Sequence, residues 1–256
     1  MSEEDQYVAV WENVWAHSTY QPTAVLEDRG TVEGYRQFRS FVPPQARLIL
    51  EAGCGTGRFC NLLGRDLPHC KVIGIDLSAS ALATARNGKE VMRCENVSFQ
   101  TASHFALPFP DNHFDFVFNE GVIQLFPPEG TLTDRDAIRE MVRVTRPGGA
   151  VLVSVVNWAC FPHTFYKWRL RHGRVHYEYG YEKSYRPGEL RRLFHAAGLR
   201  HVQFAGFYPA YGFYRLSGRL RHGRRTMRAL GALVDRLDCP WLSRIFGFEI
   251  IAVGTK

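Results

Sequence analysis

The sequence predicts an α/β fold in which a parallel sheet is covered by helices on both faces. From Leu48 onward, short apolar runs of strand length alternate with stretches of helical character. Such alternation is typical of a parallel sheet whose crossover helices cover it. The 256 residues, 45% of them hydrophobic, are enough for one substantial core and lie near the upper limit of a single domain. We therefore expect one domain over residues 1–256, with an N-terminal helical segment at 1–45.

Seven strands are expected, each at a short apolar run bounded by polar or turn residues. They are Leu48–Ala52, Lys71–Asp76, Val97–Gln100, Phe114–Asn119, Ala150–Val156, His201–Tyr208 and Phe248–Gly254. Three helices have clear start signals. Gly57–Arg65 follows the first strand directly, Ser78–Arg86 opens with a capping serine, and Thr133–Val144 opens with a threonine cap and two aspartates in its first turn. The sequence Arg-Pro-Gly-Gly at 146–149 then ends the third helix and starts the next strand.

Two segments interrupt the alternation, at about 157–185 and 209–247. Each follows the carboxyl end of an expected strand, and ligands of open α/β sheets bind at that edge. We therefore expect both segments to form helical cap insertions on the substrate side. The second contains a basic amphipathic stretch, Tyr211–Leu237, which either packs its apolar stripe on the domain or makes peripheral contact with a membrane.

Positive charge is concentrated late in the chain. Residues 165–228 hold 15 Lys and Arg but only 3 Asp and Glu, whereas the formal net charge of the whole chain is +7. Such a segment suits an anionic substrate, nucleic acid or a membrane surface, and arginine-rich helix faces in water produce it as well. Charge alone therefore leaves the partner open.

The six cysteines form no Cys-x-x-Cys pair and no zinc-ligand spacing, so we expect reduced thiols and no metal site. The first residues, MSEEDQYVAV, are acidic where a signal peptide would be basic. The longest apolar run, Ala150–Val156, is far shorter than the ~18 residues that a membrane span needs. These features predict a cytoplasmic protein.

The stretch LILEAGCGTGRF, at 48–59, has glycines at 53, 55 and 57, where a buried strand turns into a helix. Glycines there bare the backbone to a ligand at a helix N-terminus. A P-loop would need Gly-Lys-Ser/Thr after the last glycine, and a dinucleotide fingerprint would need glycine in place of Arg58. Asp76 ends the run KVIGID, where a strand-end carboxylate can accept both hydroxyls of a ribose. An adenosine without a pyrophosphate is therefore the expected ligand.

Two further motifs, ALPFPDNHFDFVFNEG at 106–121 and REMVRVTRPGG at 139–149, follow in order. With all four motifs the chain resembles the class I S-adenosylmethionine-dependent methyltransferases, the group that contains quinone, sterol and natural-product enzymes. The resemblance covers Leu48–Val156 and, more weakly, the helical stretch Tyr185–Leu199. It implies a Rossmann-like, mostly parallel seven-stranded sheet with an antiparallel last strand. It also implies S-adenosylmethionine as the cofactor, with S-adenosylhomocysteine as the product.

The resemblance assigns a contact to each motif. Gly53, Cys54, Gly55 and Gly57 would wrap the methionine and ribose part, and Glu51 would lie near the amino group.

On the adenosine side, Asp76 would hold the ribose hydroxyls and Leu77 would lie against the adenine. Where the family has an aspartate that contacts the adenine amine, this chain has Ser103, so Ser103 and His104 are expected to offer one hydrogen bond each.

Asn119, Glu120 and Gly121 would lie beside the sulfonium and the transferred methyl group. If the acceptor must lose a proton, His163 and Glu120 are the candidate catalytic bases, His163 by its position in the first cap insertion.

The expected function is methylation of a small-molecule acceptor, on oxygen, by direct in-line displacement. Two alternatives stay open. The basic C-terminal region would suit an RNA methyltransferase, although no RNA-binding module is appended and nucleic acid is not the expected partner. The serine at position 103 would suit a cofactor-binding protein without turnover. A monomer and a homodimer are both compatible with the sequence.

Overall fold

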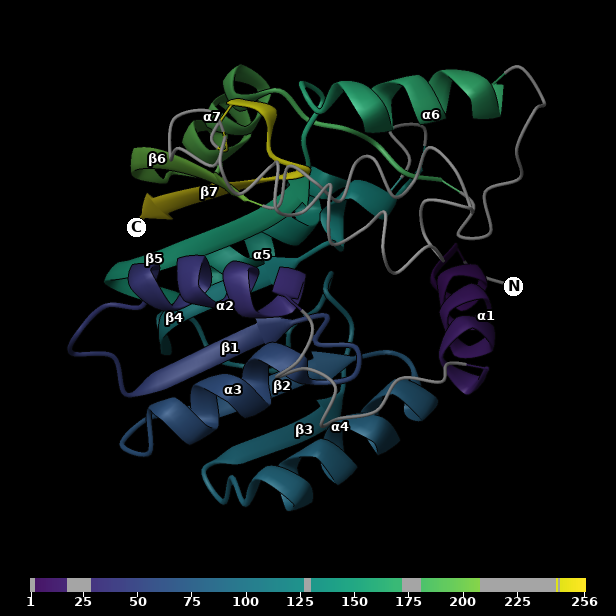
Figure 1. Cartoon of the computed structure of the whole chain (residues 1–256). Helices are drawn as coiled ribbons and strands as arrows, with labels where there is room; N and C mark the ends of the chain where they lie inside the picture. The colour runs from purple at the N-terminus through teal and green to yellow at the C-terminus, as the bar shows by residue number, and fades with distance from the viewer. Residues whose placement is uncertain (1–2, 18–28, 127–129, 172–180, 208–242, 244) are drawn as a thin grey trace.

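A computed structural model describes residues 3–17, 29–126, 130–171, 181–207, 243 and 245–256, and its centre is one seven-stranded sheet (Figure 1). The strand order is β3-β2-β1-β4-β5-β7-β6. All pairs from β3 to β5 are parallel, and β7 runs antiparallel to both β5 and β6. This confirms the predicted sheet with its antiparallel last strand. The strands are β1 Leu48–Ala52, β2 Lys71–Asp76, β3 Val97–Thr101, β4 Phe114–Glu120, β5 Thr145–Val156, β6 Arg200–Phe207 and β7 Glu249–Thr255.

Helices cover both faces of this sheet. The core on one face takes side chains from α2, α3 and α4, and the core on the other takes them from α5 and α7. The helices are α1 Glu3–Ala16, α2 Arg29–Phe41, α3 Arg58–Asp66, α4 Ala79–Met92, α5 Asp134–Val144, α6 Phe161–Arg171 and α7 Pro187–Ala196, with a short 3-10 helix, η2, at Ile123–Leu125.

The predicted start of α4 is confirmed, and the end of α4 and the start of β5 differ from the prediction by several residues. The hydroxyl of Ser78 accepts a hydrogen bond from the Ala81 amide at 3.1 Å and so begins α4. That helix runs past the predicted end at Arg86, because it ends only where Arg93 takes a left-handed φ of 55°. β5 begins at Thr145 instead of Ala150, because the stretch after α5 already pairs with β4 across a register irregularity.

The two predicted cap insertions differ in how much of them the structure describes. The first contains α6, which lies at the periphery of the molecule (Figure 1). The second, with the amphipathic stretch Tyr211–Leu237, lies outside the described residues apart from its last few positions. Within the described ranges, no helix is both long and apolar enough to cross a membrane.

Candidate cofactor and acceptor site

The loop between β1 and α3 needs its glycines. Gly53, Gly55 and Gly57 have φ values of +81°, +50° and +69°, which L side chains rarely adopt. At Gly57 a Cβ atom would also lie 2.7 Å from the Cβ of Ala85 and from the ring of Phe99. The loop therefore turns tightly and holds the N-terminus of α3 against α4 and β3.

Asp76, at the end of β2, is anchored by this loop. Its Oδ2 accepts a hydrogen bond from the Gly55 amide at 2.8 Å, and its Oδ1 accepts one from the Ser78 amide at 2.9 Å. Each carboxylate oxygen can accept a second hydrogen bond, so the group is oriented without being saturated. Burial raises the pKa of Asp76. Leu77 follows it and is half-buried at the same edge.

Glu51, near the end of β1, is buried, with 2% of its surface exposed. Its Oε2 accepts hydrogen bonds from the amide of Cys60 at 3.0 Å and from the thiol of Cys60 at 2.9 Å. Burial raises the pKa of Glu51 to about 8, and it also raises the pKa of the Cys54 thiol beside it. The amide of Cys60 belongs to the first turn of α3, where helix N-termini favour a carboxylate.

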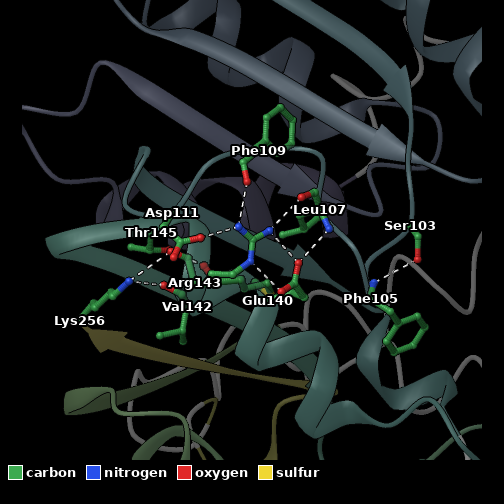
Figure 2. A network of polar contacts seen from close by, with 11 residues as sticks. Ser103, Phe105, Leu107, Phe109, Asp111, Glu140, Val142, Arg143, Thr145 and Lys256 are labelled. Carbon is green, nitrogen blue, oxygen red and sulfur yellow. Dashed lines mark hydrogen bonds and ion pairs between the residues drawn. The ribbon is translucent and has the colours of Figure 1, made fainter.

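A network around Arg143 of α5 positions the loop between β3 and β4 (Figure 2). The guanidinium donates to the carbonyls of Leu107 and Phe109, each at 2.9 Å, and it pairs with Glu140 and Asp111. Glu140 in turn accepts a hydrogen bond from the Leu107 amide at 2.9 Å. The sequence analysis missed this arginine, whose only signal is an acid three residues earlier on the same helix.

Ser103 and His104 lie at the start of this loop. The Ser103 hydroxyl oxygen accepts a hydrogen bond from the Phe105 amide at 3.1 Å, which leaves its own proton available for donation (Figure 2). His104 is buried, and its ring lies against Gly53, where a Cβ atom would come within 2.7 Å of it. Burial lowers the pKa of His104 to about 4, so the imidazole is neutral at pH 7. His104 thus stands close to the glycine loop.

The predicted sulfonium neighbours end β4. Asn119 is fully buried and donates to the Ala52 carbonyl at 2.7 Å, which ties β4 to β1. Glu120 forms an ion pair with Arg58 of α3 at 2.6 Å. Gly121 has a φ of +73° and lets the chain turn away from the sheet. The structure therefore brings these residues to the edge that carries the glycine loop.

Helix α1 stands over this edge (Figure 1). The Glu12 carboxylate accepts hydrogen bonds from the Ser78 hydroxyl at 2.6 Å and from the Ser80 amide at 3.2 Å, at the N-terminus of α4. The ring of Trp15 lies against Gly55, 3.3 Å from where a Cβ atom would be. Hydrogen bonds from the serines lower the pKa of Glu12. The sequence analysis did not identify Glu12.

His163 of α6 is fully buried. Its Nε2 lies 2.8 Å from Glu182 Oε1, and its ring meets the Phe248 ring edge to face at 5.2 Å. Lys167 donates to the Glu182 carbonyl at 2.7 Å. These contacts join α6 to the segment ahead of α7 and to the start of β7. The catalytic roles of His163 and Glu120 stay predictions.

Glu249, the first residue of β7, is a polar group at this edge that the sequence analysis missed. Its Oε2 accepts a hydrogen bond from the Ser154 hydroxyl of β5 at 2.5 Å. Burial, together with the charge of the nearby Glu120, raises the pKa of Glu249 to about 8. The signal was present in the sequence as a single acid in the apolar run Phe248–Gly254.

The strand order and the glycine loop facing a strand-end acid define a Rossmann-like methyltransferase fold. Comparison with known families agrees, because residues 49–149 match the family described as "Methyltransferase domain". Residues 49–149 thus carry a methyltransferase domain, which confirms the resemblance drawn from the four motifs.

Among curated proteins, the chain is 32% identical over 158 residues to "Probable tRNA methyltransferase 9B" of Bos taurus, which covers 60% of this chain and 31% of that protein. It is 40% identical over 111 residues to the ubiquinone/menaquinone biosynthesis C-methyltransferase of Hahella chejuensis, covering 41% of each. A solved methyltransferase of Thermotoga maritima aligns with a TM-score of 0.64 at 19% identity, over 97% of this chain and 99% of that one. The chain spans less than half the length of these two curated relatives.

Proposed function

We propose that this chain is an S-adenosylmethionine-dependent methyltransferase that acts on a small-molecule acceptor, by methylation on oxygen. The observation that carries the proposal is the Asp76 carboxylate, held by two backbone amides with acceptor capacity to spare, opposite a loop of left-handed glycines. A ribose diol needs such an acceptor, and a bare backbone admits the rest of an adenosyl group.

The residues at the edge fit this cofactor, which supplies an electrophilic methyl group on a cationic sulfur. Asp76 would take the ribose hydroxyls, and Gly53, Cys54, Gly55 and Gly57 would accommodate the adjoining atoms. Glu51 would face the amino group. These groups make no bond to the moving methyl.

On the other side of the cofactor, Leu77, Ser103 and His104 would form the adenine side. The His104 imidazole is neutral, so it would add no positive charge to a site that takes up a cationic cofactor.

Catalysis by these residues is chiefly a matter of alignment. In-line displacement needs nucleophile, carbon and leaving sulfur on one axis in a dry pocket, and such positioning is worth ~7–11 kcal/mol. Asn119 and Gly121 would define one wall of that pocket, and Trp15 of α1 would help to exclude water. Removal of a proton from the acceptor would contribute another ~10²–10⁴-fold.

Isothermal titration calorimetry with S-adenosylmethionine tests the cofactor assignment. We expect Asp76→Ala to weaken binding by at least tenfold, because the ribose loses a charged acceptor worth about 1.5–3 kcal/mol. Glu95→Gln, at an exposed acid of the same half of the chain, should bind like the wild type. Unchanged affinity in Asp76→Ala would reject the ribose assignment.

A second candidate acceptor is RNA. Two observations favour it: the 15 basic residues at 165–228, and the similarity to a protein named as a tRNA methyltransferase. RNA binding that neutralises several phosphates must weaken steeply with salt. A filter-binding series with bulk tRNA between about 50 and about 300 mM KCl distinguishes the two acceptor classes. Methyl transfer to any acceptor would remove the third possibility, a protein without turnover.

A further inference from the structure

Three acidic side chains lie in a row on one face of the sheet. Glu51 of β1 pairs in register with Phe118 of β4, and Glu120, two residues further on, pairs with Ser154 of β5. Side chains two residues apart on a strand share a face, so Glu51, Glu120 and Ser154 point to the same side. The hydrogen bond from Ser154 brings Glu249 to that side as well. The row runs from the glycine loop to the start of β7.

The surroundings of Glu249 favour the protonated form of its carboxyl group when no cationic ligand is bound nearby. Charged groups face it from three other elements: Glu120 of β4, Arg58 of α3, and Glu182 ahead of α7, which is itself bound by His163 and Lys167 of α6. Arg58 is already paired with Glu120. Burial and the two other acids therefore favour the neutral form of Glu249, against the Ser154 hydrogen bond, which favours the ionised form.

The side chain is nevertheless reachable. Glu249 and Glu120 are half-buried, in contrast to the fully buried strand residues around them. Within the described residues no group of three His, Cys, Asp or Glu side chains is arranged to hold a metal ion. A cation beside Glu120 would favour ionisation of the neighbouring carboxyl.

We propose that Glu249 takes the proton of the acceptor during methyl transfer, and that it is ionised for this task by the positive charge of the bound cofactor. The inference rests on the proposed function. It narrows the acceptor to a small molecule whose nucleophilic oxygen or nitrogen carries a hydrogen.

The scheme balances in atoms and charge. The bond that forms joins the acceptor oxygen or nitrogen to the methyl carbon, and the bond that breaks joins that carbon to sulfur, which keeps the electron pair. The acceptor hydrogen passes as a proton to the carboxylate of Glu249. A cation and an anion become a neutral sulfide and a neutral carboxyl, so the net charge of the buried site does not change.

Proton release on cofactor binding tests this without knowledge of the acceptor. We would titrate the full chain with S-adenosylmethionine and with S-adenosylhomocysteine in two buffers of different ionisation enthalpy at pH about 7.5, near the pKa of the free site. The sulfonium compound should release up to one proton more than the neutral thioether. Below pH about 8, the affinity of the sulfonium compound should rise with pH by up to tenfold per unit more than that of the thioether, because both ligands carry the amino group that Glu51 would face but only one carries the sulfonium charge.

Glu249→Gln should abolish the difference in proton release between the two ligands. The matched control is Glu189→Gln, at a half-exposed acid of α7 that is paired with Lys183, and this variant should retain the difference in proton release. Ser154→Ala keeps the carboxyl but removes the hydrogen bond that favours ionisation, so release should move to higher pH; this variant serves if Glu249→Gln does not fold. Equal release by both ligands in the wild type, or an undiminished difference in Glu249→Gln, overturns the proposal. Failure of the wild type to bind either ligand would instead count against the proposed function.

Discussion

Replacement of Arg143 by methionine should weaken both the fold and the loop that carries Ser103 and His104. The arginine is the donor that fixes the Leu107 and Phe109 carbonyls, and methionine has a similar length without any donor. The loss would also leave the carboxylate of Glu140 without its guanidinium.

The magnitude follows from the contacts. Each hydrogen bond that involves a charged group contributes about 1.5–3 kcal/mol, and two of them join Arg143 to carbonyls. The guanidinium side chain is 32% exposed and Asp111 is 67% exposed, so water replaces part of the loss and the Asp111 pair adds little. We expect a decrease of about 2–4 kcal/mol in the free energy of unfolding. For a chain of this size that lowers Tm by roughly 4–15 °C.

Thermal unfolding followed by circular dichroism measures the effect. The control is Arg139→Met on the same helix, because Arg139 is 65% exposed and its ion pair with Asp136 is 3.4 Å long. That variant should change the free energy of unfolding by less than about 0.5 kcal/mol. If Arg143→Met melts within about 2 °C of Arg139→Met, the loop does not depend on this network and the reasoning is refuted.

Three further outcomes are expected. Gly57→Ala should lower the free energy of unfolding in urea by about 2–4 kcal/mol, because the φ of +69° and the 2.7 Å approach to Ala85 both oppose a Cβ atom. The control Gly188→Ala lies in open space on α7 and should be neutral or stabilising. Equal effects of the two substitutions would contradict this. Glu51 has a folded pKa of about 8, above its unfolded value, so its contribution is fully present at pH about 4 and is lost as pH rises to about 8. Wild-type stability should therefore fall relative to Glu51→Gln between those pH values, by at most about 1.4 kcal/mol per unit, and a constant difference would be inconsistent with the buried carboxyl. Glu12→Gln should weaken the hydrogen bonds that hold α1 to the start of α4, at a cost of ~1 kcal/mol. Limited proteolysis should then cleave α1 about fivefold faster. An unchanged cleavage rate would show that other contacts hold the helix.

Much of the fold was readable from the sequence because its signals are local. Apolar runs marked all seven strands, and Ser78 marked the start of α4. Boundaries failed where pairing or packing overrode the local pattern, as in the extension of α4 to Met92 and of β5 back to Thr145. The antiparallel direction of β7 was predicted from the family resemblance, because the residues of a strand do not indicate the direction in which it pairs.

For the site, the glycine loop and Asp76 could be predicted from the residues alone. These lie within one strand, helix and strand unit, where the turn conformation and the strand end dictate the residue types. The contacts of Glu249 with Ser154, of Arg143 with the loop before β4, and of Glu12 with α4 became visible in the folded chain alone. Each of these contacts joins segments far apart in the chain. Their geometry depends on strand register and helix packing, which arise from the whole core and leave no local pattern along the chain.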